Sequence, residues 1–157
     1  MNKKIIGVVA CSAVAASMAI GASASDDLIK VGYAQVGHES DWRTANTQNY
    51  QDVFSEANGY ELSFVDCDND NAAQIEAVRN FINQELDYIV IAPIQSAGWD
   101  TVLQEAQDAG IPVIIADREI EASDDLYDAW VGTNTTNEGI TAGNWLAENL
   151  DGKEANI

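Results

Sequence analysis

The chain has 157 residues, 46% of them hydrophobic, which is enough for one domain of ordinary size. It carries 26 acidic side chains against seven basic ones, a formal net charge of −19. Such a surface repels phosphate backbones and anionic lipid headgroups, so composition argues against nucleic acid as a partner.

The first 24 residues have the pattern of a secretory signal peptide. Lys3-Lys4 forms a basic start, Ile5 to Ile20 is mostly apolar, and Ala22-Ser23-Ala24 is an A-x-A cleavage site. A membrane anchor is the alternative, but the apolar run is shorter than the roughly 20 residues that a spanning helix needs. We therefore expect a mature chain that starts near Ser25, outside the cytoplasmic membrane, with a net charge of about −21.

The cysteines predict neither a disulfide nor a metal site. Cleavage of lipoprotein type at Cys11 would leave only Ile5 to Ala10 as the apolar region, so a secretory leader fits better. Cys67 is then the single cysteine, and we expect a small, partly buried residue at a strand end rather than a nucleophile. His38 is the single histidine, and no His/Cys metal cluster exists. The sequence therefore predicts no metal and no cofactor.

Strand and helix patterns alternate along the mature chain. Leu28 to Val36 is a strand candidate. Asp41 to Ala57 repeats apolar residues with a helical period, and Asn58-Gly59 ends that helix. Tyr60 to Val65 then alternates between apolar and polar residues, which predicts the next strand.

The middle of the chain continues this alternation. Asn71-x-x-Gln74 resembles a capping box, and it precedes a helix whose apolar stripe runs from Ile75 to Leu86. Tyr88 to Ala92 is a short, continuous apolar strand. Ala97 to Ala109 has a helical pattern, and Pro112 to Ala116 is the next strand.

The last part of the chain predicts one more strand and one more helix. Ala129 to Val131 is the strand, and Thr135-x-x-Glu138 caps the helix. Its inward stripe should consist of Ile140, Gly143, Leu146 and Leu150. Asp151 to Ile157 has the pattern of a turn and the start of a sixth strand, so we expect the chain to be a fragment.

Strands that alternate with helices predict an α/β fold with an open, doubly wound parallel sheet. A weak repeat supports it, because Gly59 precedes Asp66 by seven residues and Gly110 precedes Asp117 by seven. Ligands of open parallel sheets bind beyond the carboxyl ends of the strands. We therefore expect Asp66, Asp117 and Arg118 to point into one crevice.

Several enzyme and metal motifs are absent from the sequence. It contains no G-x-G-x-x-G after the first strand, no phosphate-binding G-x-x-x-x-G-K-[ST] loop and no G-x-S-x-G elbow. The acids Asp66, Asp68 and Asp70 invite a calcium site, but an EF-hand loop starting at Asp66 would have Asn71 in place of glycine and Ala77 in place of glutamate. This segment is expected to be a polar turn with a helix cap.

Two loop segments combine the residue types that bind neutral sugars. Glu39, Trp42 and Arg43 follow the first strand, and Asp117-Arg118 ends the fourth. Carboxylates and guanidiniums can each hold two neighbouring hydroxyl groups, and an aromatic ring covers the C–H face of a sugar. Two other interpretations stay open. Asp117-Arg118 can be a solvated turn with Trp42 in the core, or Glu39 and Asp117 can be a glycosidase pair.

Three segments resemble the type I periplasmic solute-binding proteins of sugar ABC importers, a family that includes ribose- and galactose-binding proteins. They are Lys30 to Arg43 (KVGYAQVGHESDWR), Asp87 to Pro93 (DYIVIAP) and Ile111 to Arg118 (IPVIIADR). The galactofuranose-binding branch is most similar, because Gln35 to Arg43 matches its Q-V-G-x-E-S-x-W-R loop. The likeness spans the chain from Asp27 to Ile157.

The resemblance implies a fold of two similar α/β lobes that close on a ligand, of which residues 25–157 would be the first lobe. It also implies the residues that line the sugar site, namely Glu39, Trp42, Arg43, Asp117, Arg118 and, by position, Asn134. The implied protein is a periplasmic monomer that captures a monosaccharide similar to galactofuranose, galactose or arabinose. It would deliver the sugar to the membrane permease of an ABC importer without catalysis.

Three other functions remain to be weighed against transport. A sensory binding protein would hand its signal to a membrane receptor, and the sequence does not separate it from a transport protein. A glycoside-processing enzyme would use a carboxylate pair. Transcriptional repressors share the fold, but the signal peptide and the strong negative charge argue against a DNA-binding protein.

Overall fold

The strands and helices alternate as predicted, and the strands form one all-parallel sheet in the order β2-β1-β3-β4-β5. The computed structural model describes residues 28–150, so the predicted signal peptide and the predicted sixth strand lie outside the described residues. The strands are β1 (Ile29–Gln35), β2 (Tyr60–Asp66), β3 (Tyr88–Ile91), β4 (Val113–Asp117) and β5 (Ala129–Gly132). The helices are α1 (Asp41–Val53), α2 (Asn71–Asn83), α3 (Asp100–Asp108) and α4 (Thr135–Leu150), with short 3-10 turns η1 (Glu56–Asn58) and η2 (Asp124–Leu126).

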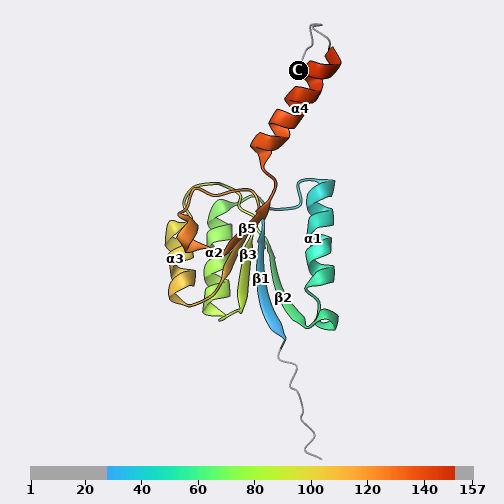
Figure 1. Ribbon diagram of the computed structural model, residues 1–157. Helices are drawn as coiled ribbons and strands as arrows, with labels where there is room; N and C mark the ends of the chain where they lie inside the picture. The colour runs from blue at the N-terminus through green and yellow to red at the C-terminus, as the bar shows by residue number, and fades with distance from the viewer. Residues whose placement is uncertain (1–27, 151–157) are drawn as a thin grey trace, which may run out of the picture.

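Helices cover both faces of the sheet, which confirms the predicted doubly wound α/β fold. Figure 1 shows α2 and α3 on one face and α1 on the other. Alternate residues of β1 serve the two faces: Ala34 packs in the cluster under α2 and α3, whereas Tyr33 packs in the cluster under α1. In the part of the chain that the structure describes, no helix is both long and apolar enough to span a membrane.

α1 begins at Asp41 as predicted, but it ends at Val53 rather than at Ala57. Two polar side chains compete for its last carbonyls. The Ser55 hydroxyl donates to the Asp52 carbonyl at 3.1 Å, and the Asn58 amide donates to the carbonyls of Asp52 and Val53 at 3.1 and 2.9 Å. These bonds replace the helical ones, and the chain turns through η1 instead.

Two other predicted helix starts were wrong. The N-cap of α2 is Asp70, whose carboxylate accepts from the backbone N–H groups of Ala72 and Ala73 at 2.8 and 3.1 Å. Asn71 and Gln74 therefore form no capping box. α3 begins at Asp100 rather than at Ala97, because Gly98 has a left-handed φ of +93° that does not fit a helix.

Gln74 has a different role from the capping role that the sequence predicted. Its buried amide donates to the carbonyls of Ala34 and Ala92 at 3.1 and 2.7 Å and accepts from the Ile94 N–H at 2.9 Å. These partners lie at the end of β1 and just after β3. One side chain of α2 thus fixes two neighbouring strands at their carboxyl ends.

Cys67 follows β2 directly and is buried, in agreement with its predicted place at a strand end. Burial, together with the charges of Asp66 and Asp70, raises the pKa of its thiol to about 11. The thiol stays protonated at neutral pH, which does not suit a nucleophile.

The predicted inward stripe of α4 was wrong, because this helix has no buried residue. The predicted cap was also wrong by one residue, because the helix already includes Thr135 and Asn134 is its N-cap. Figure 1 shows the helix extending away from the sheet beyond the carboxyl ends of the strands. Ile140 is 55% exposed, and Trp145 is 62% exposed. Among residues 28–150, no strand or helix covers the apolar side chains of α4, whereas the sheet covers those of α1.

Candidate functional site

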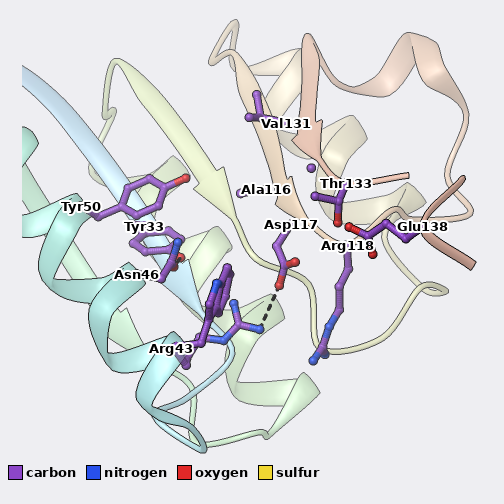
Figure 2. A pocket seen from close by; sticks show the side chains of 12 residues that line it. Tyr33, Arg43, Asn46, Tyr50, Ala116, Asp117, Arg118, Val131, Thr133 and Glu138 are labelled. Atoms are coloured by element: carbon purple, nitrogen blue, oxygen red, sulfur yellow. Dashed lines mark hydrogen bonds and ion pairs between the residues drawn. The ribbon is translucent and has the colours of Figure 1, made fainter. Parts of the chain in front are cut away.

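A cavity of about 530 Å³ opens on the α1 face of the sheet, at the carboxyl ends of β4 and β5. This volume is in the range of small-molecule sites, about 300–1,000 Å³. Its lining comes from α1, β1, β4, β5 and the start of α4 (Figure 2), and consists of Tyr33, Trp42, Arg43, Asn46, Tyr50, Ala116, Asp117, Arg118, Val131, Gly132, Thr133 and Glu138.

Arg43 is the central charged group of this cavity. The N-cap Ser40 accepts from the Arg43 N–H at 3.1 Å, which places Arg43 in the first turn of α1. The side chain is buried, and its Nη2 lies 2.9 Å from Oδ2 of Asp117 (Figure 2). Nε lies 3.4 Å from Oε1 of Glu39. These two carboxylates balance a charge that burial would otherwise make costly.

One nitrogen of Arg43 is left without a partner. Nη1 is buried and makes no hydrogen bond to any residue that the structure describes. An unsatisfied buried donor costs free energy, so such groups mark sites where a ligand or water supplies the acceptor. The guanidinium thus presents one donor edge that the residues around it do not use.

The backbone at Asp117 is held in an uncommon conformation. Its φ is +69°, in the left-handed region that non-glycine residues rarely adopt. The neighbouring strand fits this turn only because residue 132 is glycine, since a Cβ there would lie 2.2 Å from the Asp117 carbonyl oxygen. The conformation turns the carboxylate toward Arg43, and strain of this kind is found mostly at functional sites.

Trp42 and Arg118 are the accessible part of the lining. Trp42 is 57% exposed, and its ring centroid lies 4.8 Å from Cζ of Arg43. This position contradicts the interpretation of Trp42 as a core residue. Arg118 is exposed, and its guanidinium forms no ion pair with a described residue. A flat ring and a planar donor group therefore face the same space.

The structure brings together four of the six predicted site residues: Trp42, Arg43, Asp117 and Arg118. Glu39 is not part of the lining, although it contacts Arg43. Asn134 is the N-cap of α4, since its Oδ1 accepts from the Asn137 N–H at 3.0 Å. It lines a second, open cavity of about 680 Å³ along α4. The role of all six residues in sugar binding stays a prediction.

Asp66 does not point into this crevice, contrary to the expectation. It ends the edge strand β2, three positions away from β4 in the sheet, which is roughly 14 Å at the usual strand spacing. Its Oδ2 instead lies 2.7 Å from Nδ1 of His38. Asp117 ends β4. The weak repeat therefore predicted correctly that both acids end strands, but the two acids do not share one site.

Eight lining residues were not predicted, and three of them, Tyr33, Asn46 and Tyr50, come from β1 and α1. Their rings and amide form the inner wall, where Tyr33 and Tyr50 stack with centroids 4.1 Å apart. A signal for two of them exists in the sequence, since Asn46 and Tyr50 follow Arg43 at helical spacings of three and seven residues. Within residues 28–150, no group of three or more His, Cys, Asp or Glu side chains could hold a metal ion.

Comparison with known proteins agrees with this geometry. The family described as periplasmic binding protein domain matches residues 31–157. The chain belongs to the periplasmic binding protein family. The galactofuranose-binding protein YtfQ of Escherichia coli (strain K12) is similar to this binding protein, with 40% identity over 158 residues. That match covers 100% of this chain and 48% of YtfQ.

Two solved structures extend the comparison. The periplasmic binding component of the arabinose ABC transporter from Shewanella sp. ANA-3, bound to α- and β-L-arabinofuranose, is 40% identical with a TM-score of 0.73, over 78% of this chain and 41% of that one. The fructose-binding periplasmic domain of the hybrid two-component system BT1754 is 30% identical with a TM-score of 0.67, over 80% and 41%. This periplasmic binding protein thus spans about half the length of the relatives it matches.

Proposed function

We propose that this protein captures a monosaccharide of the galactofuranose, galactose or arabinose type in the periplasm and delivers it to the permease of an ABC importer. The observation that carries the proposal is Arg43, a buried guanidinium with one unpartnered nitrogen, paired with Asp117 at the carboxyl end of β4. Two similar proteins at 40% identity support the sugar class, since one is named for galactofuranose and the other contains arabinofuranose.

The site offers a sugar complementary contacts on three sides. The exposed Trp42 ring can cover the C–H face of the sugar and bury area at little entropic cost. Asp117 accepts hydrogen bonds from hydroxyl groups, whereas Arg43 and Arg118 donate to them. Because every hydroxyl both donates and accepts, this mixture suits a polyhydroxylated neutral ligand.

The protein is also proposed to hold its ligand between two lobes, of which residues 25–157 form the first. Its relatives are about twice as long as this chain, and the start of α4 lines the cavity before the helix extends away from the sheet. The uncovered stripe of α4 is proposed to pack against the second lobe. Closure of two lobes around a sugar is a hinge motion that a permease can recognise.

The proposed function is binding without turnover. Glu39 and Asp117, the carboxylates of the alternative glycosidase interpretation, both contact the guanidinium of Arg43. That arrangement orients them as hydrogen-bond acceptors. A sensory role is the second candidate, because the similar fructose-binding domain belongs to a two-component system. Deletion of the importer's permease separates the two, since it abolishes sugar uptake but leaves a sensory response intact.

The test is a calorimetric titration of the protein, expressed from its whole coding sequence, with galactose, arabinose, ribose, glucose and amino acids. We expect saturable binding of a sugar, and Arg118→Ala should weaken it by about tenfold to a hundredfold through the loss of charge-assisted hydrogen bonds. Arg79→Ala is the matched control, because Arg79 lies on α2 and pairs with Glu105 away from the cavity. A flat response to every sugar would overturn the proposal.

A further inference from the structure

A fully buried glutamine sets the polarity of the inner wall of the cavity. Gln35, at the end of β1, is 0% exposed, and its Oε1 accepts from the Val36 N–H at 3.0 Å. The backbone donor fixes which end of the amide is oxygen. Nε2 therefore faces α1, where it donates to Oδ1 of Asn46 at 2.9 Å and to the Thr47 hydroxyl at 3.1 Å.

The orientation of the Gln35 amide determines the orientation of the Asn46 amide. Its Oδ1 accepts from Gln35 Nε2 and also from the Tyr33 hydroxyl, each at 2.9 Å. Burial raises the pKa of Tyr33, so its phenol stays a neutral donor at physiological pH. A flipped Asn46 would turn its NH₂ group against the NH₂ group of Gln35. The network thus holds Oδ1 inward and leaves Nδ2 on the other side.

The Nδ2 group of Asn46 is an unused donor at the cavity wall. Asn46 lines the cavity, between Tyr33 and Arg43 (Figure 2), and is half-buried. Nδ2 makes no hydrogen bond to any residue within 28–150, although Oδ1 has two partners. A donor whose rotation is blocked by a buried network is preorganised for a ligand oxygen.

We infer that Asn46 is a further specificity-determining residue, whose Nδ2 donates a hydrogen bond to one hydroxyl group of the bound sugar. The inference rests on the proposed function. Asn46 lies four residues after Trp42, about 6 Å further along the helix axis. It therefore contacts the part of the sugar that extends past Arg43 toward Tyr50, not the part that packs on the Trp42 ring. Tyr33 and Gln35 act by positioning its amide.

The chemistry of this contact predicts selectivity rather than general affinity. A site built to hydrogen-bond one substrate oxygen rejects an analogue that lacks it, because the polar group of the site is then left unpaired. A deoxy sugar that lacks this hydroxyl should bind more weakly than the parent sugar. Deoxygenation at positions that Asn46 does not contact should leave its contribution unchanged.

The experiment is a titration of the full-length protein and its Asn46→Asp variant with the preferred sugar and its set of monodeoxy analogues. Aspartate keeps the oxygen that Gln35 and Tyr33 bind but replaces the Nδ2 donor with an acceptor. The sugar hydroxyl would then have to donate instead of accept, beside a new negative charge in a cavity that Asp117 also lines, so we expect the parent sugar to bind about tenfold more weakly or worse. For one deoxy analogue the variant and the wild type should bind almost equally, which a merely structural role would not produce.

The matched control is Asn49→Asp, the same chemical change on the exposed side of α1, which should bind every sugar like the wild type. Tyr33→Phe removes one bond that holds the amide, so it should reduce selectivity at the same hydroxyl severalfold. If Asn46→Asp fails to fold, Asn46→Ala removes the same donor without adding a charge. It also removes the Oδ1 that Gln35 and Tyr33 contact, so its readout is the comparison between the parent sugar and the deoxy analogues, not the absolute affinity.

Two results are distinguishable. If Asn46→Asp and Asn46→Ala bind all sugars as the wild type does while Arg118→Ala loses binding, the role of Asn46 is wrong and the proposed function stands. If the wild type itself binds no sugar, the proposed function is wrong and the inference falls with it.

Discussion

The two faces of the sheet differ in how polar their buried residues are, although the same strands build both faces. On the face under α2 and α3, large apolar side chains such as Phe81, Trp99 and Leu103 are fully buried. On the face under α1, the buried residues include Gln35 and Arg43, and the wall opens into the cavity. The first face is an apolar core throughout, whereas the second combines a smaller apolar cluster, which includes Val31 and Val90, with a polar wall at the carboxyl ends of the strands.

The difference follows from how many helices cover each face. Two helices close the first face, and Gly32 lets Phe81 approach β1, since a Cβ there would lie 2.6 Å from the phenylalanine ring. Among the described residues, α1 alone covers the second face and leaves Val131 of β5 65% exposed. Alternate residues of a strand point to the two faces, so we expect one set to contribute mainly to stability and the other to include the residues that line the cavity.

The largest expected effect is a loss of stability from a substitution on the face under α2 and α3. Phe81→Ala should lower the free energy of unfolding by about 3–5 kcal/mol, because it leaves a cavity under α2. Sugar affinity of the folded protein should stay near that of the wild type. Denaturant unfolding followed by titration below the transition checks both. A loss of affinity that parallels the loss of stability would show that the two faces are not independent.

Gly132→Ala tests the join between β4 and β5. The new Cβ would lie 2.2 Å from the Asp117 carbonyl oxygen, so the strands must shift, at a cost of about 1–3 kcal/mol in unfolding free energy. Sugar affinity should fall with it, since Asp117 moves. Gly139→Ala on α4 is the matched control, because nothing lies within 4 Å of its Cβ. Equal stability of the two variants would contradict the close approach.

Trp42→Ala should affect the open face alone. Trp42 is 57% exposed, so the unfolding free energy should change by no more than about 0.5 kcal/mol. Sugar affinity should fall about tenfold, the effect of losing a stacked aromatic face. Trp42→Phe keeps a ring and should restore much of the affinity in the same titration. Wild-type affinity in Trp42→Ala would remove this residue from the site.

The smallest effect concerns His38 and Asp66 at the end of β2. Asp66 accepts a hydrogen bond from the His38 ring, and this bond and the carboxylate charge raise the pKa of His38 above 6.5. That contribution to stability is therefore fully present below pH 6.5 and is lost as the pH rises through the raised pKa. Burial opposes ionisation of Asp66, but the Asp68 N–H and His38 lower its pKa below 3.8. The contribution of this carboxylate is therefore present above pH 3.8 and lost on acidification.

Both contributions are fully present together between pH 3.8 and 6.5, and each is lost progressively outside this interval. The thermal midpoint of His38→Ala should differ from that of the wild type by a small amount, and most in this interval. Asp66→Asn should give the same pH profile. A difference that does not change with pH would show that the pair observed at 2.7 Å has no energetic role.

Much of the fold was predictable because it depends on local patterns. Strand β3 is a short apolar run, and Gly110 ends α3 in a left-handed conformation with φ of +73°, as its position before β4 indicated. The boundaries were predicted less well, since Asn58 and Asp70 each compete for backbone groups through side-chain contacts that periodicity does not contain. For the site, residue type and position near strand ends made Arg43 and Asp117 candidates, and the family resemblance favoured them over the other interpretations.

The sequence by itself determined the fold class and the charged residues of the site, because hydrophobic period and the position of polar residues after strands are local properties. Only the tertiary structure decided which strand ends meet, since β2 and β4 are separated by two strands in the sheet. It also decided that α4 extends away from the sheet, and that Gln35 orients Asn46. These outcomes depend on contacts between residues that the chain brings together only when it folds.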